Sequence, residues 1–288
     1  MIFNDNDGVS LIGSEWIYFK IYTGESLADK LLPEILTISK ELYTAKIIDK
    51  WFFIRYYDPK FHIRLRFHLT DSKNLLYVIE SKNVFLSKYL TNGFIENIQL
   101  DTYVKETERY GGKDGIILSE NIFFADSVMM CELLSSLGQN KEEQRWLFGL
   151  VNIDSFMNDF NLSIEKKFVF LDNLVKYFQG DFLKNKYLNK QFDVKFKNHL
   201  KEINSILKDN KIDLYESLVN MRHRIHNPII SAVINGVAKG VVHKQILDLL
   251  SSYIHMSCNR LFRTEHRRHE FVLYNLLLRF YKCEFYSK

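Results

Sequence analysis

The stretch WFFIRYYDPKFHIRLRFH, residues 51–68, predicts two strands that are rich in hydrophobic residues and joined by a tight Asp-Pro turn. In the second strand hydrophobic and basic residues alternate, so one face carries His62, Arg64, Arg66 and His68. Both faces of the first strand are apolar or aromatic, which is typical of a central strand covered on both sides. Alternation alone favours a solvated polar face, but a covered arginine needs an anionic partner. We therefore interpret the basic face as the wall of a pocket for an anion.

Two further strands and two helices flank this hairpin in the sequence. Hydrophobic periodicity predicts strands at 15–22, 50–57, 61–70 and 93–104, and helices at 26–43 and 73–90. The resulting order, β-α-β-β-α-β, is that of a ferredoxin-like antiparallel sheet. In that arrangement the two helices cover one face of the sheet, and the other face can receive a ligand or a further layer.

The rest of the chain, residues 119–288, has a helical pattern. We expect a break at Asn227-Pro228 and a loop over the glycine-spaced residues 230–242. The predicted fold class is α+β, with a ferredoxin-like subdomain at 1–118 packed on a mostly helical subdomain at 119–288. With only 3 Pro and 12 Gly, the sequence contains no long flexible linker, so the two subdomains should be tightly joined and act as one domain.

Composition excludes several classes of protein. A hydrophobic content of 47% and an aromatic content of 15% over 288 residues exclude a disordered chain. The net charge of +4 indicates neither a nucleic-acid-binding coat nor a basic membrane anchor. We find no signal peptide and no apolar run near the roughly 18 residues of a membrane-spanning helix. The 3 cysteines lack metal-site spacing and fit reduced thiols, so we expect a soluble cytoplasmic protein.

Two other motifs carry residues suited to chemistry. In KETERYGG, residues 105–112, Glu106 and Arg109 lie where a strand meets a Gly-Gly turn, although a solvated charged loop is the plainer interpretation. In HMSCNR, residues 255–260, His255 and Asn259 share a helix face. An imidazole there could transfer a proton near neutral pH, or it could be structural.

Metal and cofactor sites find little support in the sequence. The histidine pairs of HRIHNP and EHRRHE could each share a helix face, but adjacent arginines oppose a cation and no HExxH motif is present. Nucleotide-binding and acyl-serine motifs are absent, so we expect no metal and no other cofactor. The strand order is shared with RNA-binding RRM domains, yet HIRLRFH lacks their glycines and outward aromatics, so we expect no direct contact with nucleic acid.

Taken together, these motifs resemble the C-terminal glutamate-elimination domain of class I lantibiotic dehydratases, which also occurs as stand-alone thiopeptide-type bacteriocin biosynthesis proteins. The resemblance rests on EWIYFKIYTG, WFFIRYYDPKFHIRLRFH, YVKETERYGG with SENIFFADS, and HMSCNRL, which span nearly the whole chain. It implies a lyase that removes glutamate by β-elimination from glutamylated Ser or Thr of a precursor peptide, leaving dehydroalanine or dehydrobutyrine. The family's large glutamylation domain is not in this sequence, so we expect a separate tRNA-dependent glutamylating protein as a partner. A homodimer is left open.

The resemblance also implies roles for individual residues. The family's essential arginines match Arg66 and Arg109, and its essential histidine matches His255, so these three are expected to be catalytic. The residues expected to bind substrate are Arg64, Glu106, His62, Asn259 and Arg260. Arginine suits a glutamyl substrate because its planar guanidinium binds carboxylates through paired hydrogen bonds. His255 would transfer the proton, and whether it acts as acid or base is left open.

Two alternatives to elimination remain open at this point. Stand-alone relatives of this kind include thiopeptide pyridine synthases, which join two dehydroalanines in a formal [4+2] cycloaddition and then release the leader peptide. A non-catalytic accessory subunit that binds only the leader peptide is the other alternative. The joint presence of the RxR, ERYGG and HMxxNR elements favours elimination.

Overall fold

A computed structural model describes residues 8–137, 142–182, 186–208 and 213–286 of the chain. Contacts group these residues into two compact units, each of which is described by itself. The sheet unit consists of the described residues up to 137 together with 231–245, and the helical unit contains the others. The predicted boundary after residue 118 stays a prediction.

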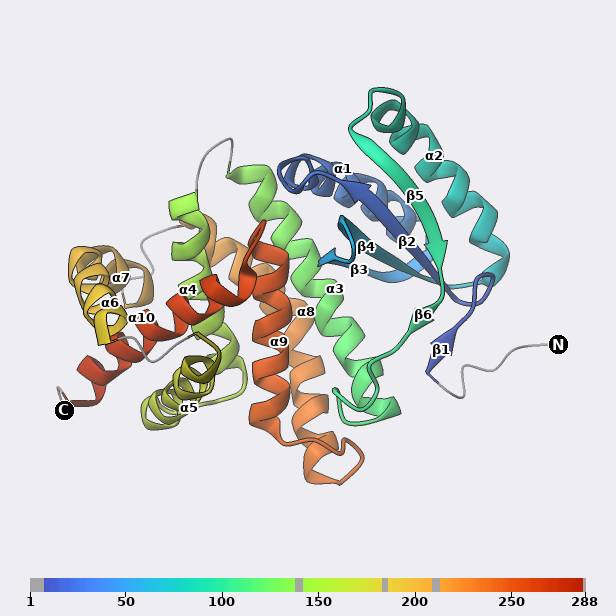
Figure 1. The fold of residues 1–288 in the computed structure, drawn as a ribbon. Helices are drawn as coiled ribbons and strands as arrows, with labels where there is room; N and C mark the ends of the chain where they lie inside the picture. Colours follow the sequence, from blue (N-terminus) through green and yellow to red (C-terminus); the bar gives the residue numbers. More distant parts are fainter. Residues whose placement is uncertain (1–7, 138–141, 183–185, 209–212, 287–288) are drawn as a thin grey trace. The chain divides into compact units, whose positions relative to one another are not determined.

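The sheet unit is built on four antiparallel strands in the order β3-β4-β2-β5 (Figure 1). These strands are β2 (Trp16–Thr23), β3 (Ile48–Tyr57), β4 (Phe61–Leu69) and β5 (Ile95–Asp101). Helix α1 (Glu25–Thr44) connects β2 to β3, and a 3-10 turn (Ser72–Asn74) with helix α2 (Leu75–Thr91) connects β4 to β5. The predicted β-α-β-β-α-β order and the α+β fold class are confirmed.

Two short strands and one long helix complete the sheet unit. Strand β1 (Val9–Ser10) pairs with β6 (Tyr103–Val104), which continues from β5 after one residue. Helix α3 (Lys113–Ser136) follows a Gly-Gly turn and packs against β3 and α1. This helix also covers the sheet edge, because Ser127 Oγ accepts a hydrogen bond from the backbone N–H of Phe53.

The alternation in β4 sorts its side chains between the two faces of the sheet. Ile63, Leu65 and Phe67 are all buried, on the face toward α1. The basic side chains of β4 lie on the opposite face, beside the residues of β2 that share it. The register pairs Tyr18 with Arg66 and Trp16 with His68, so aromatic and basic side chains are neighbours on that face.

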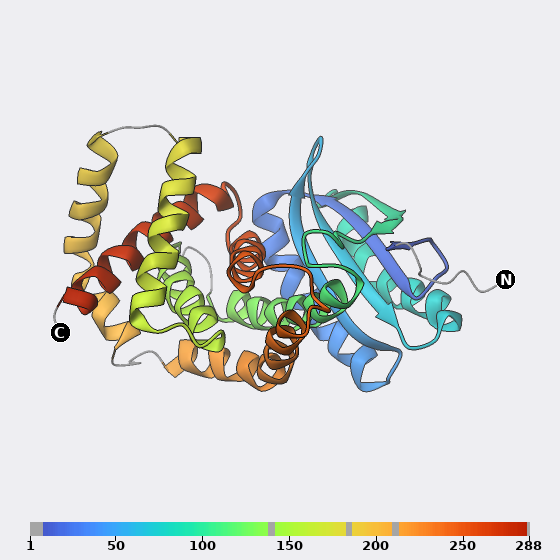
Figure 2. The same ribbon diagram turned by 90° about the horizontal axis from the view of Figure 1, so that it is seen from below.

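The prediction that residues 50–57 form a central strand is wrong. Strand β3 lies at the edge of the sheet, and Figure 2 shows its hairpin with β4 from a second side. Residues 51–55 are nevertheless buried, because α1 and α3 both pack against this strand. Cover by these two helices explains why both faces of β3 are apolar although the strand has a neighbour on one side only.

Arg55 in β3 has the partner that a covered arginine requires. Its Nη2 donates to Asp29 Oδ1 on α1 at 2.6 Å, and the two side chains are only 3% and 9% exposed.

Breaking this pair should remove a carboxylate from the buried Arg55 guanidinium. We expect Asp29→Ala to lower the free energy of unfolding by about 3–5 kcal/mol, measured by urea denaturation. Glu96→Ala, which breaks the exposed Lys60–Glu96 pair of the same unit, should lower it by less than about 1 kcal/mol. Equal losses in the two variants would contradict this interpretation.

The helical unit is built from the helices that follow α3, of which α8 is shared with the sheet unit. These helices are α4 (Glu142–Asp159), α5 (Ile164–Phe182), α6 (Lys186–Asn198), α7 (Leu200–Leu207), α8 (Asp213–Ala238), α9 (Ile246–Leu261) and α10 (His266–Tyr286). Helix α8 runs through both units, with residues up to 230 in the helical unit. Within the described part of the chain, none of the helices combines the length and the apolar character needed to cross a bilayer.

The break expected at Asn227-Pro228 and the loop expected over residues 230–242 are wrong for most of their length. Helix α8 continues past Pro228 to Ala238. Proline removes one helical hydrogen bond and costs about 3 kcal/mol in a helix interior. The side chains of Ile230 and Val233, which follow it, are fully buried, and this burial offsets the cost.

Candidate functional site

The sheet unit places the guanidinium of Arg66 among aromatic rings. Its Cζ lies 4.4 Å from the ring centre of Tyr18 and 4.5 Å from that of Tyr103, with Phe52 at 5.3 Å. Register explains two of these contacts, because Arg66 pairs with Tyr18 of β2 on one side and with Phe52 of β3 on the other. The side chain is therefore held on three sides by π faces, and only 7% of Arg66 is exposed.

Arg66 has no described carboxylate to neutralise it. No described acidic group forms an ion pair with it, and its buried Nε has no hydrogen-bond partner among the described residues. Burial lowers the pKa of Arg66, and the nearby tyrosines and Glu106 oppose that shift. A buried cation without a counter-ion is unfavourable unless an anion comes to it. The arrangement can therefore bind an anionic group.

The KETERYGG element acts on Arg66 through its charge, because Glu106 opposes the lowering of the Arg66 pKa. Arg109 Nη1 donates to Glu106 Oε2 at 3.1 Å, and the Arg109 side chain is 35% exposed. Gly111 and Gly112 both have positive φ angles, +82° and +99°, which favour glycine. A Cβ on Gly111 would also lie 2.7 Å from Val242, so both the backbone conformation and the lack of space at this position require glycine.

His62 accepts a hydrogen bond from Arg64, its neighbour on the basic face of β4. Its Nδ1–H donates to the Lys60 carbonyl at 3.0 Å, and its Nε2 accepts from Arg64 Nε at 3.2 Å, with the tautomer assigned from these partners. Burial lowers the pKa of His62, which fits a neutral ring. The Arg64 guanidinium stacks on Tyr56 at 3.3 Å and is half-buried. His62 therefore positions Arg64. Arg66 is the basic residue of this face of β4 that has neither a hydrogen bond nor an ion pair to another described side chain.

The helical unit places His255 against a buried carboxylate. His255 Nδ1 lies 2.9 Å from Glu270 Oε2 of α10, and Tyr274 Oη donates to Glu270 Oε1 at 2.7 Å. Glu270 is 2% exposed, whereas the His255 side chain is 21% exposed. A carboxylate on Nδ1 fixes the tautomer and leaves Nε2 with its lone pair. The pair is therefore arranged for proton transfer at Nε2.

His266 is a second imidazole beside this pair. Its ring centre lies 5.4 Å from that of His255. Burial lowers the pKa of His266 from 6.5 to about 4, and the charge of His255 contributes to the shift.

This shift makes stability depend on pH. The unfolded chain takes up a proton at His266 near pH 6.5, and the folded chain only near pH 4. The free energy of unfolding should therefore fall as the pH drops through this interval. Thermal melts of His266→Asn should show a weaker fall than the unmodified protein. Parallel curves for the two proteins would contradict the assignment.

The other two residues expected to bind substrate in the helical unit are interior. Asn259 is 6% exposed and Arg260 is 1% exposed, both on α9. They share that helix with His255, so the HMSCNR element is a single structural feature. Their role in substrate binding stays a prediction.

Some side chains around these residues were not singled out in the sequence. Glu270 and Tyr274 of α10 hold His255, and no motif spacing connects them to it. Trp16 and Tyr18 of β2 share a face of the sheet with Arg66, and nothing in the sequence marked their polar atoms as unsatisfied. The alternation in EWIYFKIY was the signal that could have led to them.

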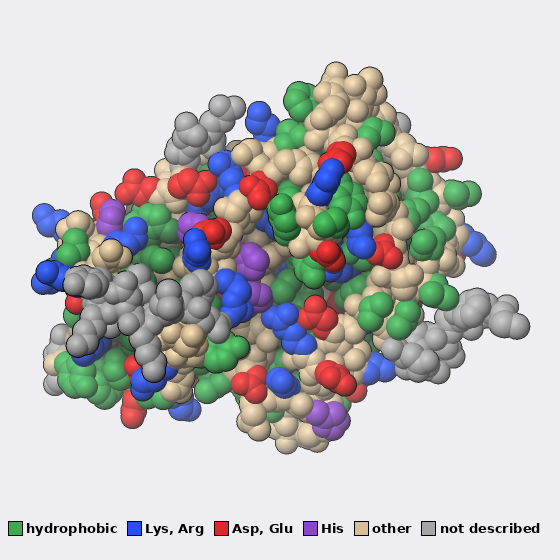
Figure 3. All heavy atoms as spheres, in the orientation of Figure 1, with side chains coloured by type: hydrophobic (Ala, Val, Ile, Leu, Met, Phe, Trp, Pro, Cys, Tyr) green, Lys and Arg blue, Asp and Glu red, His purple; other side chains and the backbone are tan. Residues whose placement is uncertain are grey.

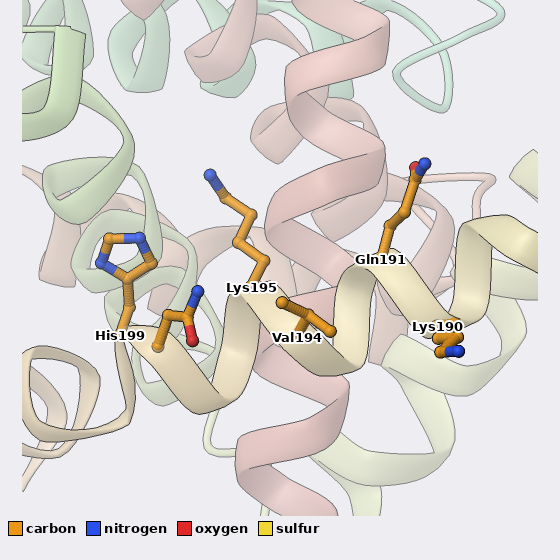
Figure 4. Close-up of a pocket in the computed structure, with 6 residues that line it drawn as sticks. Lys190, Gln191, Val194, Lys195 and His199 are labelled. Carbon is orange, nitrogen blue, oxygen red and sulfur yellow. The ribbon is translucent and has the colours of Figure 1, made fainter.

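The helical unit also has a cavity of about 450 Å³ lined by α6 and the residue after it. Figure 4 shows Lys190, Gln191, Val194, Lys195 and His199 around it. Its lining has two lysines and no acidic side chain, and the positive charges oppose a metal ion.

A group of three potential metal ligands shares His199 with this cavity. Among the described residues, Glu143, His199 and Glu202 are the one set whose ligand atoms lie within 4.8 Å of one another. The carboxylates are exposed, and such acidic clusters are common on surfaces without an ion. The histidine pairs of HRIHNP and EHRRHE do not belong to this set.

Basic and acidic side chains are interspersed on the face drawn in Figure 3, as the small net charge leads one to expect.

Comparison with known proteins identifies relatives over almost the whole chain. The family described as lantibiotic biosynthesis dehydratase C-term matches residues 16–281. The nisin biosynthesis protein NisB of Lactococcus lactis subsp. lactis is 27% identical over 278 residues, which are 96% of this chain and 26% of NisB. The subtilin biosynthesis protein SpaB of Bacillus subtilis is 24% identical over 269 residues, 90% of this chain and 25% of SpaB. The chain thus spans about a quarter of the length of these curated relatives.

Solved structures share the fold at lower identity. The tRNA-dependent lantibiotic dehydratase MibB from Microbispora sp. 107891 has a TM-score of 0.72 at 19% identity, covering 93% of this chain and 28% of MibB. TsrL has a TM-score of 0.70 at 13% identity, covering 95% of this chain and 96% of TsrL. TbtD, a pyridine synthase from thiomuracin biosynthesis, has a TM-score of 0.63 at 14% identity, covering 95% and 99%. The chain belongs to the lantibiotic biosynthesis dehydratase C-terminal family.

Proposed function

We propose that this protein eliminates glutamate from glutamylated Ser or Thr residues of a precursor peptide. The observation that carries the proposal is the chain of contacts from Tyr274 to Glu270 to His255, since elimination needs a base and this arrangement provides one. The guanidinium of Arg66, which forms no ion pair with a described residue, also supports it, because the leaving group of this reaction is a carboxylate. Membership of the family makes a precursor peptide the expected substrate.

The reaction breaks two bonds and forms one double bond. A base takes the Cα proton of the modified residue, the Cα–H electron pair forms the Cα=Cβ bond, and the Cβ–O bond breaks. Glutamate leaves with the electron pair of that C–O bond as a carboxylate. The products are free glutamate and dehydroalanine or dehydrobutyrine, and neither an oxidant nor a reductant is required.

His255 is assigned to the proton transfer. Glu270 accepts from Nδ1–H, which fixes the tautomer and stabilises the imidazolium that forms. Tyr274 fixes the other oxygen of the carboxylate, so Glu270 cannot rotate away. A positioned base of this kind contributes about 10²–10⁴-fold to the rate.

Arg66 and Arg109 are assigned to the negative charge. The substrate has a side-chain carboxylate on its glutamyl group, and a second carboxylate develops as the C–O bond breaks. Arginine forms paired charge-assisted hydrogen bonds with such groups. Preorganised donors of this kind are worth about 2.7–4 kcal/mol each in a site that excludes water. Glu106 accepts from Arg109 and so holds that side chain in one position.

Glutamate must be attached before it can be eliminated. We propose that a separate tRNA-dependent glutamylating protein carries out that step, and that the glutamylated peptide is what reaches this chain.

The test is mass spectrometry of a glutamylated precursor peptide, incubated with and without the purified protein. Loss of glutamate together with the appearance of dehydro residues supports the proposal. If glutamate stays attached, a peptide that already carries two dehydroalanines should be offered instead. A new ring with release of the leader would mean a pyridine synthase, and inertness on both peptides would mean an accessory binder.

A further inference from the structure

The Tyr18 hydroxyl is a buried donor with no partner among the described residues. Its side chain is 4% exposed, and no hydrogen bond is made by Oη. Buried polar atoms in folded proteins are nearly always hydrogen-bonded, so an orphaned one needs an explanation. Tyr18 lies opposite Arg66 in the sheet, with its ring 4.4 Å from the Arg66 Cζ. The two residues therefore belong to one local environment.

Trp16, which lies next to Tyr18 on the same face of β2, also has a buried side-chain donor. The residue is 2% exposed, and its Nε1–H, which can only donate, has no partner among the described residues. Its ring packs at 5.3 Å from Tyr103 and at 5.6 Å from Phe52, two of the three rings that flank Arg66. With Arg66 Nε, the sheet unit thus has three unsatisfied buried donors in side chains that share one face of β2 and β4.

The charges around Tyr18 favour an anionic acceptor. The charges of Arg66, Arg64 and Lys20 all act on its hydroxyl. Lys20 is paired with Asp101, and Arg64 donates to His62. Arg66 forms no such pair with any described residue, although the charge of Glu106 acts on it. Because burial raises the pKa of Tyr18, its hydroxyl keeps its proton and stays a donor at neutral pH.

Tyr103, the opposite wall, differs from Tyr18 in one respect. Its hydroxyl donates to Glu120 at 3.1 Å, and Glu120 also lies 3.6 Å from Lys105 Nζ. Tyr103 is thus anchored and contributes only its ring to Arg66. The contrast leaves Tyr18 as the tyrosine whose donor is available.

We propose that Tyr18 donates a hydrogen bond to the carboxylate that Arg66 binds, with Trp16 Nε1 as a second neutral donor. A carboxylate offers enough lone pairs for all three donors and neutralises Arg66 as well, whereas a neutral carbonyl would leave the charge buried. Resting on the proposed function, the carboxylate is the side-chain one of the glutamyl group. Tyr18 and Trp16 then determine specificity for an acidic leaving group.

The experiment compares Tyr18→Phe and Trp16→Phe with Tyr22→Phe, which removes an exposed hydroxyl from the same face of the same strand. We expect KM for the glutamylated peptide to rise about 10–100-fold in Tyr18→Phe, the effect of losing a hydrogen bond to a charged group. Trp16→Phe should show a smaller rise, and Tyr22→Phe should stay within about twofold. Thermal melts should show no loss of stability in Tyr18→Phe, because its hydroxyl has no partner to lose. A lowered melting temperature with unchanged KM would mean a structural role and would overturn the proposal.

A second measurement separates this inference from the proposed reaction. Calorimetric titration with L-glutamate and with L-glutamine tests the carboxylate site without any elimination. Binding of glutamate but not of glutamine, weakened in Tyr18→Phe, supports the inference even if no dehydro residue ever forms. Elimination that proceeds with the same KM in Tyr18→Phe and Tyr22→Phe would overturn the inference and leave the proposed function standing.

Discussion

Replacing His255 with alanine is expected to reduce glutamate elimination by about 10²–10⁴-fold, the usual contribution of a positioned general base. The Nδ1 atom of this imidazole contacts the buried Glu270. The substitution therefore removes the base together with the contact that stabilises the base once it is protonated. The effect should lie in kcat rather than in KM, because the base acts on the Cα proton and not on the glutamyl group. Single-turnover kinetics followed by mass spectrometry measures it.

Glu270→Gln provides the matched control for this prediction. The amide keeps the size of the side chain but cannot stabilise an imidazolium, so activity should fall by less than in His255→Ala and the pH profile should change. Full activity in His255→Ala would remove this residue from the mechanism. Equal activity in Glu270→Gln and the unmodified protein would reduce Glu270 to a packing role.

Replacing Arg66 with methionine should abolish most of the activity without destabilising the fold. Loss of one preorganised charged donor costs about 10²–10³-fold in rate. The free energy of unfolding should be unchanged or raised by about 1 kcal/mol, because a buried charge without a counter-ion is exchanged for an apolar side chain of similar length. Activity assays and urea denaturation on the same preparation measure both quantities.

Arg66→Lys separates the charge from the geometry in this prediction. Lysine keeps the positive charge but loses the planar fork and its stacking between two rings, so it should restore only part of the activity. A large loss of stability in Arg66→Met would mean that Arg66 stabilises the folded protein through a structural partner. It would contradict the proposal that Arg66 binds an anionic group of the substrate. Asp29→Ala, which breaks the ion pair of the buried Arg55, shows what such a loss looks like.

Much of the sheet unit could be predicted from local patterns. Period-two alternation in β4 placed Arg66 and Arg64 on one face, because successive side chains of a strand must point to opposite sides. Helical spacing between the strands then fixed the β-α-β-β-α-β order. The edge position of β3 could not be predicted, since helices that cover both faces of a strand give the same apolar pattern at the edge of a sheet as in its centre.

The parts that failed depend on contacts between distant segments. The helix that runs through Pro228 is maintained by the burial of Ile230 and Val233, and this burial is not visible in the local sequence. The partner of His255 comes from the next helix at Glu270, without any characteristic spacing. Arg55 pairs with Asp29, whereas Arg66 forms no ion pair with a described carboxylate. This difference could not be read from the sequence either, because it depends on which distant segments pack against each strand.

The most direct test of the central claim is to count products from a synthetic peptide that carries a single O-glutamyl-serine. Elimination predicts one dehydroalanine for every glutamate released, with the rate falling sharply in His255→Ala and in Arg66→Met. Ester hydrolysis would also release glutamate, but it would regenerate serine. Glutamate release accompanied by serine, or glutamate retained on the peptide, would contradict the account.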